Sequence, residues 1–398
     1  MKTLIELYST LAIENVLGPE TFRPERVVYL CPPEIAADKK RAEALRRFFR
    51  ERGLAPELLM TESDLFDAED LLRQLRALGE RYEDIAVDVG GGTDAALFAA
   101  GRFCQSSGTP AFTYSRHQNR FYNLCHADFA AGLPCTLRYS VADFFRMAGG
   151  RLRQGRVDNS LLMGRRESFT PFFRVFLRYR RGWTDAILYL QRISQPGQRE
   201  EPELTAEGAW TQKGEHGRAV QADPALLADL QAIGFIHDLS VTEGERVRFT
   251  FADAQTRAWL RDVGSVLELY TWNACVEAGI FDDIISSAVV DWDDAAGRDN
   301  VCNEIDVVAA RGVLPLFISC KACEVRTEAL NELAILRDRF GGKGAKAVIV
   351  TTENCCAAAR HRAAQLGIAV LDLEELENGR AADRLRVIMK VEKQLAEK

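Results

Sequence analysis

The 398-residue sequence lacks the features that would place it in a membrane or among fibrous proteins. It contains no run of about 18 uncharged apolar residues, the length that a membrane-spanning helix needs. The opening MKTLIELYST has one lysine and then Glu6 inside a short apolar run, which is a poor signal peptide and a good first strand. Low-complexity tracts are also missing, and 47% apolar with 27% charged residues is typical of globular proteins. We therefore expect a cytoplasmic protein of about two or three domains.

The cysteines show no disulfide pattern. Ten of them are spread irregularly over the chain, which favours free thiols. Two local pairs, Cys320 with Cys323 and Cys355 with Cys356, suggest a zinc site as the alternative. The second pair lacks the spacing with which two thiolates hold one tetrahedral ion, and no histidine stands beside either pair. Small, buried, inert thiols are the preferred interpretation.

Lysine is absent between Arg146 and Arg192, although arginine is abundant there. This segment has eleven arginines and only three acids, a local net charge of +8 in a chain whose net charge is −7. Such a segment is a candidate electrostatic footprint for nucleic-acid phosphates. The alternative is a set of arginines that lie on a solvated face or pair with acids elsewhere in the fold. The sequence leaves both interpretations open.

The first 140 residues alternate short apolar runs with helical patterns. We predict strands at 3–8, 26–31, 56–60, 84–89 and 111–115, and helices at 35–52, 68–78 and 93–106. Strands separated by helices of about 10–15 residues form a parallel sheet with helices on both faces. The predicted fold class is therefore α/β, with a Rossmann-like parallel sheet over residues 1–140.

A glycine cluster, Gly90–Gly92, joins the strand at 84–89 to the helix that begins near Thr93. Backbone N–H groups at such a helix N-terminus attract anions. A plain tight turn is one alternative, and a phosphate loop of actin-like or sugar-kinase-like ATPases is another. The ATPase fold needs a second glycine loop near the amino terminus, where Leu7–Thr10 contains no glycine.

Two further residues end the last predicted strand of this sheet. Arg116 and His117 stand at the carboxyl edge, where open α/β sheets bind ligands. They could meet a phosphate or be ordinary surface residues, and the sequence does not decide between these interpretations.

Residues 141–252 are predicted to form a connector between two domains. The pattern is helical to about Ser194, and the polar stretch Gln195–Gly217 is typical of a loop. A helix at 224–233 and strands at 235–239 and 247–251, joined around Gly244, then resemble the hairpin of a winged-helix unit.

Residues 253–398 have the element order of a PD-(D/E)XK, restriction-endonuclease-like core. We predict a helix at 253–277, strands at 284–291, 303–310 and 314–320, a helix at 327–340, a strand at 345–351, a helix at 355–366, a short strand at 369–372 and a terminal helix. In that core, one strand of a hairpin supplies an acid, and the next supplies an acid and a lysine two residues apart, on one face. The carboxylates hold Mg²⁺ or Mn²⁺ beside the scissile phosphate, and the lysine stabilises charge in the transition state.

Three residues match the chemistry of that core. Asp306, in the run NEIDVV, is the predicted primary metal ligand. Lys321 ends the apolar strand FISCK and is the predicted catalytic lysine, with a side chain that merely extends to solvent as the alternative. Glu268 stands in an otherwise apolar helical run and can reach the same point from the preceding helix.

These motifs resemble a known family. Gly264–Glu268, Asn303–Asp306, Phe317–Lys321 and Glu328–Gly341 together are similar to the nuclease domain of CRISPR-associated Rossmann-fold (CARF) effectors. That family joins a nucleotide-sensing domain to a PD-(D/E)XK nuclease. The resemblance implies a cytoplasmic homodimer that cleaves DNA or RNA when a cyclic oligoadenylate from a type III CRISPR complex, cyclic tetra-adenylate for this chain, binds across its two-fold axis.

By the same resemblance the ligand contacts lie in two segments of the first domain. The loop Ser9–Asn15 supplies Ser9, Thr10 and Asn15, and the glycine turn supplies Gly91, Gly92 and Thr93. Asp94 follows this turn, where a basic residue would suit a phosphate better.

The chain departs from the nuclease pattern at Ser319, which stands where an acid is expected. A hydroxyl cannot supply the charge that a metal ion requires. We expect Glu332 from the next helix to compensate, with Glu328 as second choice, so the predicted metal ligands are Asp306, Glu268, Cys320 and Glu332. If neither glutamate reaches the site, the protein is a ligand-controlled nucleic-acid-binding regulator with an inactive nuclease-like domain.

Overall fold

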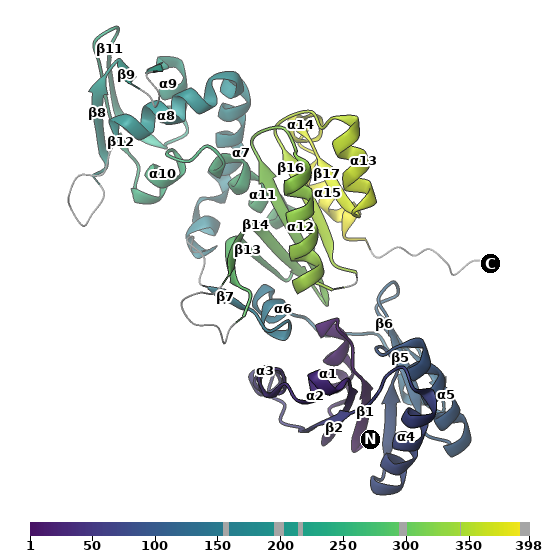
Figure 1. Cartoon of the computed structure of the whole chain (residues 1–398). Coiled ribbons are helices and arrows are strands. Elements are labelled where there is room, and N and C mark those ends of the chain that lie inside the picture. Colours follow the sequence, from purple (N-terminus) through teal and green to yellow (C-terminus); the bar gives the residue numbers. More distant parts are fainter. Residues whose placement is uncertain (154–158, 195–202, 214–217, 294–300, 343, 391–398) are drawn as a thin grey trace.

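The computed structural model describes residues 1–153, 159–194, 203–213, 218–293, 301–342 and 344–390. Figure 1 shows one sheet at the amino-terminal end, a second sheet in the centre, and a lobe of helices and short strands beyond it. None of the helices in these ranges is long and apolar enough to cross a membrane.

The first sheet has six strands in the order β3-β2-β1-β4-β5-β6. β1 to β5 are parallel, as predicted, while β6 pairs antiparallel with β5 and was not predicted. The strand order reverses between β1 and β4, which is the place where open α/β sheets bind ligands. The strands are β1 (Thr3–Leu7), β2 (Arg26–Cys31), β3 (Glu57–Glu62), β4 (Ile85–Asp88), β5 (Ala111–Ser115) and β6 (Arg120–Cys125).

Helices cover both faces of this sheet. α3 contributes to one hydrophobic core, and α4 and α5 contribute to the core on the opposite face. The predicted helix at 35–52 is interrupted, because Asp38 accepts a hydrogen bond from the Arg41 N–H and starts a new helix. The helices are α1 (Leu17–Phe22), α2 (Pro33–Ala36), α3 (Lys39–Glu51), α4 (Ala68–Arg81) and α5 (Asp94–Ser107).

The second sheet has the order β17-β16-β15-β14-β13-β7. Its centre is the antiparallel run β13, β14 and β15, followed by parallel β16 and β17. α11 and α15 pack on one face and α12 on the other. The elements are β7 (Arg151–Arg153), α11 (Ser265–Ala278), β13 (Asp283–Asp291), β14 (Cys302–Arg311), β15 (Leu314–Lys321), α12 (Thr327–Phe340), β16 (Lys346–Thr351), α13 (Ala357–Gln365), β17 (Ile368–Leu371), α14 (Leu373–Glu377) and α15 (Ala381–Ile388).

The segment between the sheets differs from the prediction in two places. In the described part of the predicted loop at 195–217, β8 pairs with β12 and β9 pairs with β10; residues 195–202 and 214–217 lie outside the described residues. The predicted helix at 253–277 is broken at 260–264. The elements are α6 (Val141–Met147), α7 (Asn159–Tyr179), η3 (Arg180–Gly182), α8 (Trp183–Ile193), β8 (Thr205–Ala209), β9 (Thr211–Lys213), β10 (Ala219–Gln221), α9 (Pro224–Ala232), β11 (Ile236–Thr242), β12 (Arg246–Phe251) and α10 (Ala254–Trp259).

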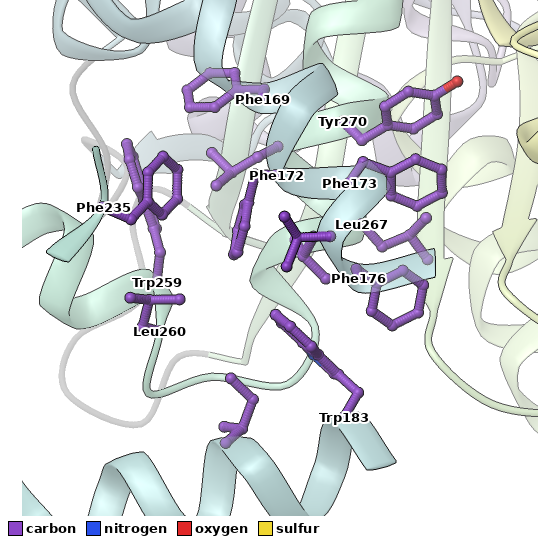
Figure 2. Close-up of a cluster of buried hydrophobic side chains, with 14 of the residues drawn as sticks. Phe169, Phe172, Phe173, Phe176, Trp183, Phe235, Trp259, Leu260, Leu267 and Tyr270 are labelled. Carbon is purple, nitrogen blue, oxygen red and sulfur yellow. The ribbon is translucent and has the colours of Figure 1, made fainter. Parts of the chain in front are cut away.

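An aromatic cluster fixes this lobe to the second sheet's helix α11. Figure 2 shows side chains of α7 lying against side chains from α8, α10 and α11. Phe173 stacks on Tyr270 of α11 with ring centroids 3.9 Å apart, and Phe169 meets Trp272 edge-on at 6.1 Å. Stacked and edge-to-face aromatic pairs stabilise a packed interface beyond their buried area.

The two sheets share one hydrophobic core through α6. Phe145 of α6 meets Phe317 of β15 and Phe340 of α12 edge-on, with ring centroids 6.3 and 5.1 Å apart. The Val141 N–H donates a hydrogen bond to Asp283 at 2.8 Å. Because a close-packed core resists small deformations, we expect a movement of the first sheet to be transmitted through α6 to the second sheet.

Candidate active site and ligand site

Asp306 is fixed at the centre of the nuclease hairpin. Its carboxylate accepts a hydrogen bond from the Cys320 N–H at 2.5 Å and another from the Ser319 hydroxyl at 3.3 Å, both on neighbouring β15. Burial raises the pKa of Asp306, while these donors and nearby Lys321 counteract the rise. Asp306 is therefore tied to the strand that ends in Lys321.

The sheet is irregular at the position of Asp306. Ile305 and Val308 belong to one core and Val307 to the core on the other face, so the in-out alternation of β14 shifts there. On the adjoining β13, Ser287 has a φ of 50°. A left-handed serine is an uncommon conformation, and such strained positions cluster at functional sites.

Glu268, on α11, lies close enough to Asp306 for the two charges to interact. Burial raises the pKa of Glu268 to about 8, and the charges of Asp306, Asp262 and Glu304 add to the rise while Lys321 lowers it. Two half-buried carboxylates and a lysine thus meet on the α11 side of the sheet. The Lys321 charge acts on both carboxylates, which favours the catalytic interpretation over a side chain that merely extends to solvent.

Glu332, the residue expected to replace the missing acid, is not brought into this cluster in the structure. It accepts a hydrogen bond from the Asn303 side chain at 3.1 Å. Its helix, α12, buries Leu330 and Leu333 in the core on the face opposite α11. Glu328, the second choice, lies in the first turn of the same helix. Sequence spacing placed Glu332 near the hairpin but could not assign its helix to a face.

Cys320 lies in the cluster, but its thiol is a poor metal ligand. The thiol donates to the Thr271 hydroxyl at 3.5 Å, and burial, followed by the charges of Asp306 and Glu268, raises the pKa of Cys320 well above its usual range. A protonated thiol does not bind hard cations, because thiolate is the form that ligates metals. The contribution of Cys320 is its N–H to Asp306.

The remaining donors fit a hard divalent cation in part. Across the residues that the structure describes, no three His, Cys, Asp or Glu side chains come together as a metal-binding group, so neither the predicted four-ligand set nor a zinc site is assembled. Glu268 and Asp306 nevertheless repel each other, which a divalent cation would relieve. Mg²⁺ in nuclease-like sites commonly uses one or two carboxylates and completes its shell with water and phosphate oxygens.

In the first sheet, the loop after β1 is held by its own side chains. The Ser9 N–H donates to the Asn15 side-chain oxygen at 2.8 Å, and the Asn15 amide donates to the Ser9 carbonyl at 2.7 Å. The Ser9 hydroxyl donates to Glu14, which forms an ion pair with Arg116 at 2.6 Å. The hydrogen bonds between Ser9 and Asn15 therefore fix the loop conformation, and Arg116 is paired with Glu14. Thr10 is exposed.

The glycine turn lies directly against this loop. A Cβ added to Gly91 would stand 2.3 Å from the Leu7 carbonyl oxygen and 2.9 Å from the Ser9 Cβ, and Gly92 has a φ of 87°. Thr93 accepts a hydrogen bond from the Ala96 N–H at 3.2 Å as the cap of α5 and donates to the Leu65 carbonyl. The structure thus brings Ser9 and Gly91 together at the point where the strand order reverses, while Thr93 caps the N-terminus of α5.

A cavity of about 550 Å³ opens beside this loop, between the two sheets. Thr10 lines it together with Arg41 from α3 and Arg339 from α12 of the nuclease part. Burial and the nearby Arg41 charge lower the pKa of Arg339. The other cationic residues that line the cavity are Lys39, Lys40 and Arg47, and its acidic residues are Asp38, Glu43 and Asp293. Such a cavity suits an anionic ligand that touches both parts of the chain.

Two buried acids lie under the same edge of the first sheet. Glu6 and Asp88 are register partners on β1 and β4, 1% and 2% exposed. Burial raises the pKa of Asp88 to about 7, against a hydrogen bond from the Gly90 N–H at 2.8 Å that favours the charged form. Burial and the Asp88 charge also raise the pKa of Glu6 well above its usual value.

We expect Asp88→Asn to stabilise the protein above pH 7. A carboxyl whose folded pKa lies near 7 and whose unfolded pKa lies near 4 makes the wild type lose stability as pH rises through that window, by up to about 4 kcal/mol. Chemical unfolding at pH 4.5 and pH 8 measures the difference. Exposed Asp94→Asn is the control, and an Asp88→Asn advantage that does not grow with pH would contradict the assignment.

Five of the ten described arginines between 146 and 192 form ion pairs with acids, and for these five the pairing interpretation of the segment is supported. Arg153 pairs with Asp291 at 2.8 Å and Arg178 with Asp229 at 2.5 Å. Ion pairs of the same kind involve Arg146, Arg151 and Arg165, while Arg156 lies outside the described residues.

Comparisons with known proteins place this geometry in a family context. Residues 255–389 match the family described as Card1-like, endonuclease domain. A comparison with curated protein sequences gives no match.

Solved structures resemble the chain as a whole. Protein VC1899 from Vibrio cholerae is 18% identical with a TM-score of 0.73, covering 98% of both chains. Can2 from Sulfobacillus thermosulfidooxidans, in complex with cyclic tetra-adenylate, is 18% identical with a TM-score of 0.69, covering 98% of this chain and 97% of its own. A type III CRISPR defence DNA nuclease activated by cyclic oligoadenylate is 15% identical with a TM-score of 0.48, covering 95% and 51%. Residues 255–389 are thus similar to the Card1-like endonuclease domain, and the chain as a whole has the fold of VC1899 and of Can2.

Proposed function

We propose that this protein is a metal-dependent nuclease that a cyclic oligoadenylate activates, acting on DNA or RNA in type III CRISPR antiviral defence. The observation that carries the proposal is the meeting of Glu268, Asp306 and Lys321 on one hairpin and its neighbouring helix, within a Card1-like endonuclease domain. The working form is a cytoplasmic homodimer.

The chain's own residues would divide the chemistry among them. Glu268 and Asp306 would hold Mg²⁺ or Mn²⁺, which supplies a more acidic water and neutralises phosphate charge when bound. Lys321 would stabilise the negative charge that develops on the scissile phosphate. Ser319 does not replace the missing carboxylate; its hydroxyl orients Asp306 instead.

The activator would act through the loop after β1. The Leu11 side chain of this loop lies 3.7 Å from the position that a Cβ on Gly342 would take. The Arg116 side chain, which is paired with Glu14 of the loop, lies 3.2 Å from the position of a Cβ on Gly344. The loop and Arg116 therefore touch the residues that directly follow α12. A ligand bound by Thr10 and the glycine turn can also reach Arg339 across the cavity. Since α12 follows the strand that ends in Lys321, a ligand that favours one arrangement of this junction would shift the population toward the active site geometry.

Cyclic tetra-adenylate is the activator that we propose. Can2, which has this fold, holds that ligand. A ring that spans two Rossmann-like domains contacts both only when the two subunits are correctly apposed, so its affinity differs between the active and inactive arrangements.

The test is a cleavage panel on the full chain. Purified protein is incubated with Mn²⁺ or Mg²⁺, with cyclic oligoadenylates of several ring sizes, and with labelled single-stranded and supercoiled substrates. We expect cleavage that requires both a divalent cation and one ring size. Cleavage that continues in excess EDTA would contradict the metal requirement, and equal cleavage without activator would contradict the regulation.

One observation favours a second function. Ser319 leaves β15 without an acid beside Lys321, and the described residues contain no assembled metal-binding group. A regulator with an inactive nuclease domain would bind nucleic acid tightly without metal and would not cut it. Binding without cleavage in the same panel would select this alternative.

A further inference from the structure

The corner between α7 and α8 lies at the edge of the nuclease site. This corner, Arg180–Trp183, belongs to the lobe outside the nuclease sheet, yet two of its side chains are bonded to that part of the chain. The Arg180 guanidinium donates to the Thr352 carbonyl at 3.3 Å. The Thr352 N–H in turn donates to the carbonyl of Lys321 at 3.2 Å. One end of the corner is therefore a single residue away from the catalytic lysine.

The other end of the corner is attached to the helix that carries the second carboxylate. The indole N–H of Trp183 donates to the Val263 carbonyl at 3.2 Å. Val263 directly precedes Gly264, the cap of α11, and Glu268 lies in the first turn of that helix. Trp183 is 2% exposed and packs in the aromatic cluster of Figure 2, so this attachment is rigid.

The corner also carries positive charge that no acid in the described part of the chain neutralises through an ion pair. Among the residues that the structure describes, no carboxylate forms an ion pair with Arg180 or Arg181, whereas Arg178 in the preceding turn is paired with Asp229. Arg181 is exposed, and Arg180 uses one of the five N–H donors of its guanidinium on Thr352. Guanidinium groups bind phosphate oxygens through their remaining donors.

We propose that Arg180 and Arg181 hold the substrate backbone phosphates that flank the scissile bond. The inference rests on the proposed nuclease function and names its binding residues. Arg180 would fix the corner to the strand end while offering donors to one phosphate, and Arg181 would contact the next. The lobe that carries α7 and α8 then completes the substrate site rather than linking two domains.

The experiment measures binding separately from cutting. Labelled single-stranded DNA and RNA of about 20 nucleotides are titrated separately by fluorescence anisotropy at several salt concentrations, with cyclic tetra-adenylate present and with Lys321→Ala in every protein to prevent cleavage. Arg181→Ala is expected to weaken binding about three- to tenfold and to lower the log–log salt slope by about 0.7, the share of one phosphate contact on a single strand. Arg181→Lys should restore most of the slope, because it keeps the charge.

The matched control is Arg73→Ala, which removes the same charge from an exposed arginine of α4 that forms an ion pair with Asp70 one turn away. Binding and salt slope should stay at the reference values in this control. An Arg181→Ala protein that behaves like Arg73→Ala would overturn the inference, as would a reference protein that does not bind DNA or RNA at all. If binding depends on Arg181 but the wild type does not cut in the cleavage panel, the inference stands and the proposed nuclease activity is wrong.

Discussion

Lys321→Ala is expected to reduce cleavage by at least about a hundredfold, the scale on which removing one preorganised charge from a transition state acts. The Lys321 charge acts on both carboxylates, since it lowers the pKa of Glu268 and of Asp306. Asp306→Asn should cause a similar loss, because the amide keeps the hydrogen bond from Cys320 but not the charge. Initial rates of cleavage with Mn²⁺ and activator measure both effects.

The matched comparison is between two glutamates. Glu268→Gln is expected to lose activity on the same scale, whereas Glu332→Gln should retain it, because Glu332 lies on the opposite face of the sheet beside Asn303. Thermal unfolding shows whether each variant is folded. If Glu332→Gln abolished cleavage and Glu268→Gln did not, our assignment of the two faces would be wrong.

The sequence predicted the order of the nuclease core and the positions of its central residues. Strands 26–31 and 111–115 and helix 327–340 have the predicted bounds, because short buried apolar runs and regular helical spacing are local signals. The sequence singled out Asp306 and Lys321 as candidates for the same reason. A polar residue stands out in an apolar strand, and a hairpin brings neighbouring strands together.

What escaped prediction depends on contacts between distant segments. β8, Thr205–Ala209, is built from small and polar residues without an apolar pattern, and its pairing with β12 makes it a strand. The ion pair of Arg153 with Asp291 joins residues 138 positions apart. Which face α12 covers, and so where Glu332 points, is likewise a property of the packed core.

The corner of the lobe illustrates the same limit for function. Composition marked the arginines between 146 and 192 as a group, but it could not separate those paired with acids from Arg180 and Arg181. That distinction needs the bond from Arg180 to Thr352 and the position of Thr352 beside Lys321.

Gly91→Ala is expected to abolish activation by cyclic tetra-adenylate. Its Cβ would lie 2.3 Å from the Leu7 carbonyl oxygen, so the glycine turn must move away from Ser9 and the shared ligand edge is lost. A switch from about 1% to 99% active needs a ligand preference of roughly 10⁴-fold, and most of that rise in rate should disappear. Cleavage with and without activator, together with calorimetric titration of the ligand, measures the loss.

A second glycine of the same segment separates ligand loss from a general defect. Gly101 lies in α5, and a Cβ there would meet nothing within 4 Å. Gly101→Ala should therefore keep full activation and stabilise the protein by about 0.5–1 kcal/mol, as alanine does inside a helix. Gly91→Ala should retain the low cleavage that the wild type shows without activator, because Glu268, Asp306 and Lys321 lie in the other sheet. Normal activation of Gly91→Ala would remove the glycine turn from the ligand site and leave the cavity at Arg339 as the place where the activator acts.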